Sequence, residues 1–363
     1  MKIRDIEFFD REEETRDIMD VLRVKPRLIT FIYGPINSGK TSLINNLIED
    51  LPDDYVVFYI NLRERMISSY RDFVETLFDY GFEEEPKKKL VKELIPGAVE
   101  SIKTLSGIPI PTNIFKKIFS EEKPKNAFRY ILKVIREVEK KNKIPIIIID
   151  ELQKIGDVKV NGLLIYELFN FFIRLTKELH LCHVFALSSD SLFIEKVYSD
   201  AVLEGRVRYI MVDDFDKETA KRFLKKYKFS VEEQEFALNY AGGKPSHLVD
   251  LIEAKANNKI KEKIKEDITK RKGEIRQGLY YVKEIGKTIA FGEAMVKLSH
   301  EKIIEVMEKF KDNEIWEYKV VTPEIVYLVS ENIIFVDPLK SIIKPQSGKD
   351  LIGIREILKE PEG

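Results

Sequence analysis

The stretch RLITFIYGPINSGKTSLINNLIEDL, residues 27–51, decides the fold. Its first seven residues are mostly apolar and include β-branched and aromatic side chains, which predicts a buried strand, and its last ten have helical spacing. The eight residues between them, GPINSGKT at 34–41, match the pattern G-x-x-x-x-G-K-[ST] at every fixed position. A strand, this loop and a helix in that order predict a phosphate-binding loop, the P-loop, at the carboxyl end of a strand.

Each residue type in the P-loop serves the binding of phosphate. Gly34 and Gly39 permit a tight turn, and the successive backbone N–H groups then converge at the start of a helix, where the dipole favours an anion. Lys40 supplies a positive charge to the β- and γ-phosphates, and Thr41 offers its hydroxyl to Mg²⁺. The P-loop therefore predicts the phosphates of a nucleotide and Mg²⁺ as ligands. The residues expected to contact the nucleotide here are Gly34, Pro35, Ile36, Asn37, Ser38, Gly39, Lys40, Thr41 and Ser42.

Short apolar runs predict the rest of the sheet. They are Leu28–Tyr33, Val56–Ile60, Pro145–Ile149, His183–Leu187 and Val207–Val212. Longer charged segments with helical spacing separate them, and this alternation is typical of an α/β fold with helices on both faces of a parallel sheet. The run Ile146–Ile149 is apolar throughout, as expected for a central strand. We predict that this core spans residues 1–212.

Polar residues follow two of these strands. The segment IIIIDELQ, residues 146–153, ends its strand with an acidic pair. Asp150 is predicted to hold Mg²⁺ through water, and Glu151 to orient and deprotonate an attacking water. The strand HVFAL is followed by SSDS at 188–191, where small polar residues either sense a γ-phosphate or form an ordinary turn.

The remaining segments predict an insertion, a lid and a third domain. Residues 83–125 carry charge runs and prolines, and we expect an insertion with a helix and a short extended piece. Helical spacing predicts a lid at 213–256. Residues 257–276 hold eight basic and four acidic side chains, which fits a linker or an exposed helix. Further helices to about Lys311 and three strands predict a winged-helix-like domain at 257–363. The strands are Tyr318–Val321, Ile325–Leu328 and Ile333–Val336.

The composition excludes some classes of protein. Sixty-one basic and 62 acidic residues give a net charge of −1 beside 44% hydrophobic residues. This rules out a disordered chain and a uniformly basic nucleic-acid coat, although local basic patches remain possible. The single cysteine, Cys182, has no partner for an intramolecular disulfide. No run approaches the roughly 20 apolar residues of a membrane span. The N-terminal residues lack the apolar core of a signal peptide. We therefore predict a cytoplasmic protein.

Taken together, these motifs resemble the archaeal ATPases of the STAND and AAA+-related P-loop class. The resemblance covers most of the chain. It is carried by FFDREEE at 8–14, GPINSGKT, IDELQ at 149–153, LSSDSLFIEKVYSDAVLEGRVRYIMVDDF at 187–215, AGGKPSHL at 241–248 and ENIIFVDPLKSIIKPQS at 331–347. It implies the strand order 5-1-4-3-2, with the five strands numbered along the chain, followed by a helical lid and a C-terminal domain.

The resemblance also implies roles for single residues. Arg11 would lie near the adenine, and Ser189 would sense the γ-phosphate. Arg206 would approach the γ-phosphate, either within the chain or from a neighbouring molecule. Pro245 would contact the nucleotide from the lid, in a segment that also reads as a simple helix-terminating turn. The predicted catalytic residues are therefore Glu151, Lys40, Arg206 and Ser189.

Three functions fit these patterns. The first is an Mg²⁺-dependent ATP hydrolase that acts as a molecular switch, with ATP and ADP as ligands and a lid that reports the nucleotide state. The second is a nucleic-acid-binding regulator or initiator-like factor with ATP as a structural ligand, suggested by the winged-helix pattern and the basic residues 259–276. The third is a small-molecule kinase. In the first two, the C-terminal domain would contact DNA or a protein partner.

Overall fold

A parallel sheet of six strands forms the centre of the N-terminal part. The computed structural model describes residues 6–63, 66–78, 104–121, 123–156, 164–198, 203–292 and 294–360. The strands are β1 (Ile29–Tyr33), β2 (Tyr55–Asn61), β3 (Thr104–Ser106), β4 (Ile144–Asp150), β5 (His183–Ser188) and β6 (Val207–Met211). Their order is β3-β2-β4-β5-β1-β6, and all neighbours are parallel. All five predicted runs are strands in the predicted order 5-1-4-3-2, and β3 extends the sheet beyond β2.

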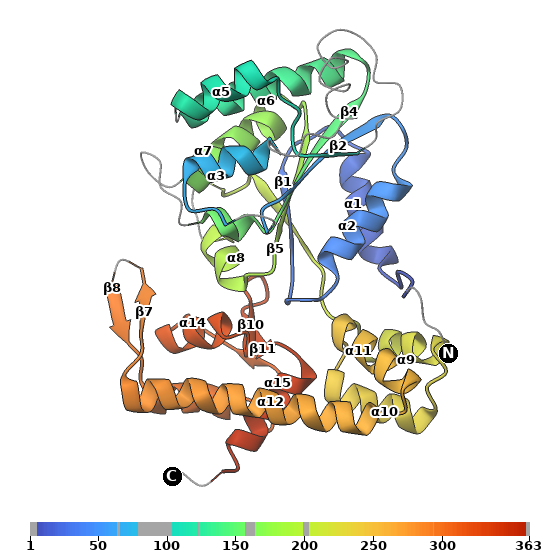
Figure 1. Cartoon of the computed structure of the whole chain (residues 1–363), viewed down its shortest axis with the longest axis vertical. Coiled ribbons are helices and arrows are strands. Elements are labelled where there is room, and N and C mark those ends of the chain that lie inside the picture. The colour runs from blue at the N-terminus through green and yellow to red at the C-terminus, as the bar shows by residue number, and fades with distance from the viewer. Residues whose placement is uncertain are drawn as a thin grey trace.

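Helices cover both faces of this sheet (Figure 1). One face carries α1 (Glu12–Leu22) and α2 (Lys40–Asp50), and the other carries α3 (Tyr70–Leu77), α5 (Thr112–Glu121), α6 (Pro124–Lys140), α7 (Leu164–Ile173) and α8 (Ser191–Tyr198). Residues along β4 alternate between the two cores, because Ile147 and Ile149 pack in one apolar cluster and Ile146 and Ile148 in the other. This double burial explains why β4 is apolar throughout.

The predicted insertion is only partly within the described residues, because 83–103 lie outside them. Of the rest, β3 supplies the extended piece and α5 the helix. The strand β3 pairs with β2 through Thr104 to Ser106.

Three short helices and one long helix follow the sheet. They are α9 (Lys217–Lys226), α10 (Val231–Ala241), α11 (Pro245–Ala256) and α12 (Ile260–Tyr280). The first three lie in the segment predicted as a lid and surround an apolar cluster, against which Ile6 and Phe9 near the N-terminus also pack. The role of these helices as a lid stays a prediction. The basic segment at 257–276 is mostly helix α12 rather than a linker, and Figure 1 shows it crossing the whole lower part of the molecule.

The C-terminal part differs from its predicted pattern. It contains β7 (Thr288–Phe291), β8 (Ala294–Lys297), α13 (His300–Glu308), β9 (Trp316–Glu317), α14 (Pro323–Ser330), β10 (Ile334–Asp337), β11 (Ile342–Pro345) and α15 (Gly348–Ile357). The strand predicted at Ile333–Val336 is β10, shifted by one residue. The hairpin β7–β8 lies where only helix was expected. A small sheet with the order β10-β11-β9 is present, whereas the winged-helix assignment stays a prediction.

Two predicted strands of this part are wrong. Residues 325–328 belong to helix α14, because the Thr322 hydroxyl accepts a hydrogen bond from the backbone N–H of Ile325 and Pro323 occupies the first turn. Residues 318–321 are not a strand, and the pairing with β11 is made by Trp316 and Glu317 just before them.

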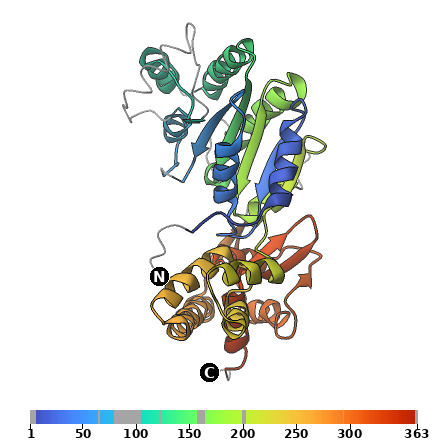
Figure 2. The same cartoon turned by 90° about the vertical axis from the view of Figure 1, so that its right-hand side faces the viewer.

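The C-terminal part docks on the sheet through β10. The Phe335 side chain is 1% exposed and belongs to the larger core of the N-terminal part. The Tyr33 hydroxyl, at the end of β1, donates to Asp337 Oδ1 at 3.0 Å, and the backbone N–H of Val336 donates to Ser191 Oγ at 3.3 Å. The lid and the C-terminal helices therefore lie against the carboxyl edge of the sheet, as Figure 2 shows from the side.

Phe335→Ala should destabilise the whole molecule, because it removes a buried ring that joins two parts of the chain. We expect a loss of about 3–5 kcal/mol in the free energy of unfolding, measured by urea denaturation. Phe236→Ala is the control, since Phe236 is 40% exposed on α10, and it should cost less than about 1 kcal/mol. Equal losses for the two variants would contradict the docking described above.

Candidate nucleotide site

The P-loop has the backbone geometry that its glycines predict. At Gly34 the φ angle is +156°, and a Cβ there would lie 2.1 Å from the Val212 carbonyl oxygen. Gly39 has a φ angle of +97° directly before α2. The hydroxyl of Ser38 is buried and has no hydrogen-bond partner among the described residues. A bound phosphate oxygen would satisfy this hydroxyl, so the loop fits the group that its sequence implies.

Lys40 is buried inside the loop. Its ammonium donates to the carbonyl oxygens of Gly34 at 3.0 Å and Pro35 at 2.8 Å. Burial and, to a lesser extent, the charge of Lys244 lower the pKa of Lys40 to about 8, against the opposing effect of Glu151 and Asp150. Carbonyl dipoles thus compensate this ammonium only in part, and an anion would compensate it better.

The predicted magnesium residues are in contact. Thr41 Oγ1 donates to Asp150 Oδ2 at 2.9 Å, and the hydroxyl of Tyr59 donates to the same oxygen at 2.8 Å. The other Asp150 oxygen accepts from the backbone N–H of Glu151 at 2.9 Å. In the part of the chain that the structure describes, no group of three or more His, Cys, Asp or Glu side chains could hold a metal alone. The pair of Thr41 and Asp150 fits Mg²⁺, which is usually held by few protein oxygens together with phosphate and water.

Glu151 lies beside Asp150 with its carboxylate held on both oxygens. Arg63 donates to Oε1 at 2.5 Å, and the amide of Gln153 donates to Oε2 at 2.8 Å. The side-chain oxygen of Gln153, Oε1, in turn accepts a hydrogen bond from the hydroxyl of Ser188 at 2.9 Å. Ser188, rather than the predicted Ser189, is therefore the residue of this strand end that connects to the acidic pair.

Arg63 was missed by the sequence analysis. It follows β2, whose last residue, Asn61, stands opposite Asp150 in the sheet. A basic residue just beyond the carboxyl end of a strand that neighbours the acidic strand is the signal that could have found it.

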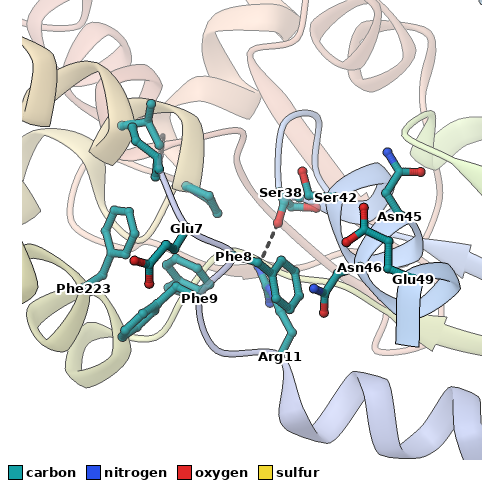
Figure 3. A pocket seen from close by; sticks show the side chains of 15 residues that line it. Glu7, Phe8, Phe9, Arg11, Ser38, Ser42, Asn45, Asn46, Glu49 and Phe223 are labelled. Atoms are coloured by element: carbon teal, nitrogen blue, oxygen red, sulfur yellow. Dashed lines mark hydrogen bonds between the residues drawn. The ribbon is translucent and has the colours of Figure 1, made fainter. Parts of the chain in front are cut away.

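A cavity of about 460 Å³ adjoins the P-loop. Its apolar lining includes Phe9, Phe215, Phe223, Pro245 and Val249. Figure 3 shows the polar side chains Ser42, Asn45, Asn46 and Glu49 of α2 across from Phe9 and Phe223. Both its size and its mixture of apolar and polar walls are typical of a small-ligand site. Pro245 thus lines this cavity, and its contact with the nucleotide stays a prediction.

Arg11 lines this cavity together with Ser38 and Gly39 of the loop. Its guanidinium donates to the carbonyl oxygens of Ser38 and Asp213, both at 2.7 Å, and lies 4.7 Å from the ring centre of Phe215. A further bond, from Arg11 to the Glu14 carboxylate, measures 2.7 Å. Arg11 thus binds protein groups, and its position near the adenine stays a prediction.

Arg206 is not at the site of its own chain. It directly precedes β6, and Val207 pairs with Ile29 at the start of β1, whereas the P-loop follows the end of β1. The length of β1 separates Arg206 from the loop, a distance of roughly 16 Å at 3.3 Å per residue. The predicted approach of Arg206 to the γ-phosphate within the chain is therefore wrong. An approach from a neighbouring molecule stays a prediction.

The lid segment AGGKPSHL contributes a residue that the sequence analysis passed over. Lys244 is 2% exposed, and its ammonium donates to the Ile36 carbonyl of the P-loop at 2.9 Å and pairs with Asp214 Oδ1 at 3.0 Å. Gly243 must be glycine, because a Cβ there would lie 1.6 Å from the carbonyl oxygen of Phe215. The segment is thus a tight turn before α11 that also brings a lysine to the nucleotide site.

Comparison with known proteins places the chain in a family. Residues 8–251 match the model of an ATPase domain found predominantly in Archaea. The chain belongs to this archaeal ATPase family. Residues 261–358 match a second model, the C-terminal domain of uncharacterized ATP-binding proteins like one from Methanocaldococcus jannaschii. The family assignment identifies the protein as an ATP-binding protein and agrees with the P-loop geometry.

Relatives of this ATPase family match over the full length. An uncharacterized ATP-binding protein of Methanocaldococcus jannaschii is 48% identical over 98% of both chains. One of Pyrococcus abyssi is 47% identical over 97% of this chain and 99% of its own. A solved Walker-type ATPase of Pyrococcus abyssi has the same fold, with a TM-score of 0.63 and 19% identity over 96% of both chains. Within the described residues, no helix is long and apolar enough to cross a membrane.

Lys40→Ala should abolish ATP binding, because it removes the ammonium that the loop holds for the phosphates. Isothermal titration calorimetry measures this directly, and circular dichroism checks that the variant is folded. Lys25→Ala is the control, since Lys25 is exposed, and it should bind ATP as the wild type does. An unchanged ATP affinity in Lys40→Ala would refute the phosphate-binding role.

Proposed function

We propose that this ATP-binding protein is an Mg²⁺-dependent ATP hydrolase that acts as a nucleotide-driven switch. The observation that supports hydrolysis best is the contact of Thr41 with Asp150 at 2.9 Å, with the buried carboxylate of Glu151 one residue further along. A P-loop alone would support binding only. The acidic pair at the end of β4, which β5 separates from β1, adds a group that can take a proton from water.

The protein groups would share the work as follows. The P-loop amides and Lys40 bind the phosphates, and Lys40 leaves the carbonyls of Gly34 and Pro35 to do so. Thr41 and Asp150 hold the metal. Mg²⁺, when bound, would neutralise charge on the β- and γ-phosphates. Glu151 orients the attacking water and accepts its proton.

The contacts of Glu151 are those expected before ATP and the attacking water are bound. Both carboxylate oxygens accept hydrogen bonds, from Arg63 and from Gln153. Each oxygen keeps a second acceptor site for water, but the two bonds hold the carboxylate in place, and one would have to open for it to turn towards the attacking water. The Arg63 side chain is 61% exposed, so it is the partner that can turn into solvent, whereas the Gln153 side chain also accepts from the hydroxyl of Ser188.

The switch part of the proposal rests on contacts that link the site to the rest of the molecule. Arg11 joins the P-loop carbonyl of Ser38 to the carbonyl of Asp213, and the Asp213 carboxylate pairs with Lys344 of β11 at 2.5 Å. Lys244 joins the lid to the loop. A change in the P-loop on nucleotide binding would therefore reach both the lid and the C-terminal part through these contacts.

Glu151→Gln should lower ATP turnover at least about 100-fold, because the amide cannot accept the proton. ATP affinity should stay within a few-fold of the wild type, since the P-loop is intact. Release of inorganic phosphate measures turnover and separates hydrolysis from transfer to a small molecule, which a kinase would show. Glu139→Gln, at an exposed position on α6, is the control and should leave turnover unchanged. Intact turnover in Glu151→Gln would show that the assigned base is wrong.

The nucleic-acid alternative has weaker support in the structure. Much of the basic charge at 259–276 is neutralised by acidic partners. Arg271 pairs with Asp350 at 2.5 Å, and Lys272 pairs with Glu360 at 2.8 Å. Paired charges offer less to a phosphate backbone than a free basic patch does.

Duplex DNA should therefore not stimulate ATP turnover, because α12 presents a largely compensated surface. Phosphate release with and without DNA measures this, and fluorescence anisotropy at two salt concentrations measures binding. Stimulation by DNA, together with an affinity that falls steeply with salt, would favour the regulator instead.

A further inference from the structure

Lys244 is a buried cation between the lid and the P-loop. It caps the start of α11 and is 2% exposed. Two oxygens hold its ammonium, the Ile36 carbonyl at 2.9 Å and Asp214 Oδ1 at 3.0 Å. Removing an ammonium from water costs several kcal/mol, and a single carboxylate rarely restores that cost. Neither the sequence motifs nor the hydrolysis proposed above uses this residue.

A second ammonium lies beside it. Lys40 binds the carbonyls of Gly34 and Pro35, and Lys244 binds the next carbonyl along the loop, that of Ile36. The two like charges repel each other, and the charge of Lys244 contributes to the lowered pKa of Lys40. An anion with several negative charges would compensate both ammonium groups at once.

The ion pair between Asp214 and Lys244 stabilises the buried ammonium only weakly. Burial raises the pKa of this carboxyl above its usual value, even though Lys244 and Lys344 both oppose the rise. Burial also lowers the pKa of Lys244. Both members of the pair thus bear a desolvation cost, which makes the ion pair easy to exchange for a more highly charged partner.

We propose that Lys244 is a second phosphate-binding lysine, which exchanges Ile36 and Asp214 for the terminal phosphate of ATP. The inference rests on the ATP site proposed above and adds to it the group that distinguishes ATP from ADP. Both lysines bind carbonyls of Gly34–Ile36, at the beginning of the loop, where we place the terminal γ-phosphate. The backbone amides at the start of α2 form the other end of the loop, where the β-phosphate would lie. ADP leaves Lys244 with Asp214, and ATP draws Lys244, and with it α11, towards the nucleotide.

The test compares two nucleotides. ADP and a non-hydrolysable ATP analogue are titrated into wild type and Lys244→Met by calorimetry, with Mg²⁺ present. The variant should lose about tenfold or more in affinity for the analogue, the size expected for one charge-assisted hydrogen bond, and keep its ADP affinity within about threefold. Lys255→Met is the matched control, because Lys255 lies on the same helix and pairs with Glu233 instead. It should change neither affinity.

A second variant should shift the preference the other way. Asp214→Asn removes the competing carboxylate, so the affinity for the analogue should rise relative to that for ADP. This variant carries the test by itself if thermal unfolding shows that Lys244→Met does not fold.

Two results would overturn the inference. One is an equal loss of both affinities, or no loss, in a folded Lys244→Met. The other is an unchanged ratio of the two affinities in Asp214→Asn. Failure of the ATP site itself would be seen separately, because the wild type would then bind neither nucleotide.

Discussion

The structure of the site depends on one constraint: the buried ammonium groups of Lys40 and Lys244 both bind carbonyls of the P-loop. Lys40 belongs to α2 and Lys244 to the lid segment. P-loop carbonyls hold both ammonium groups, and the half-buried carboxylate of Asp214 also pairs with Lys244. Such an arrangement is costly in an apolar interior, and it is reasonable only where an anion completes it. The glycines of the loop, the cavity beside it and the Ser38 hydroxyl, which lacks a partner among the described residues, would all suit that anion.

The same constraint ties the separate parts of the chain together. Asp213 and Asp214, directly after β6, contact three other elements. Asp213 accepts from Arg11 of the N-terminal arm and pairs with Lys344 of the C-terminal part, while Asp214 pairs with Lys244 of the lid. Because these contacts share one short segment, a change in the partner of Lys244 bears on the position of all three. A ligand can shift such an equilibrium only through a difference in its contacts between the two states, and a terminal phosphate would supply that difference here.

How much of this could be read from the sequence depends on how local each feature is. The P-loop and the strand β4 were predictable, because spacing and apolar runs determine them locally. The hydrophobic residues 325–328 were ambiguous between strand and helix, and the Thr322 cap and Pro323 decided for the helix. The strand order came from the resemblance, since long-range pairing leaves no local signal. Lys244 was missed because its importance lies in a contact with Ile36, 208 residues away in the chain.

The position of Arg206 could have been predicted from the direction of its strand, although the motif comparison did not use that information. In a parallel sheet all strands point the same way, so a residue that precedes a strand lies at the opposite edge from one that follows a strand. Arg206 precedes the run Val207–Val212 in the sequence, whereas Gly34 follows the run Leu28–Tyr33. Strand direction alone therefore separates Arg206 from the P-loop of its own chain. The lid follows β6, so it begins at the same carboxyl edge of the sheet as the P-loop. Its Lys244 therefore reaches the loop and donates to the Ile36 carbonyl.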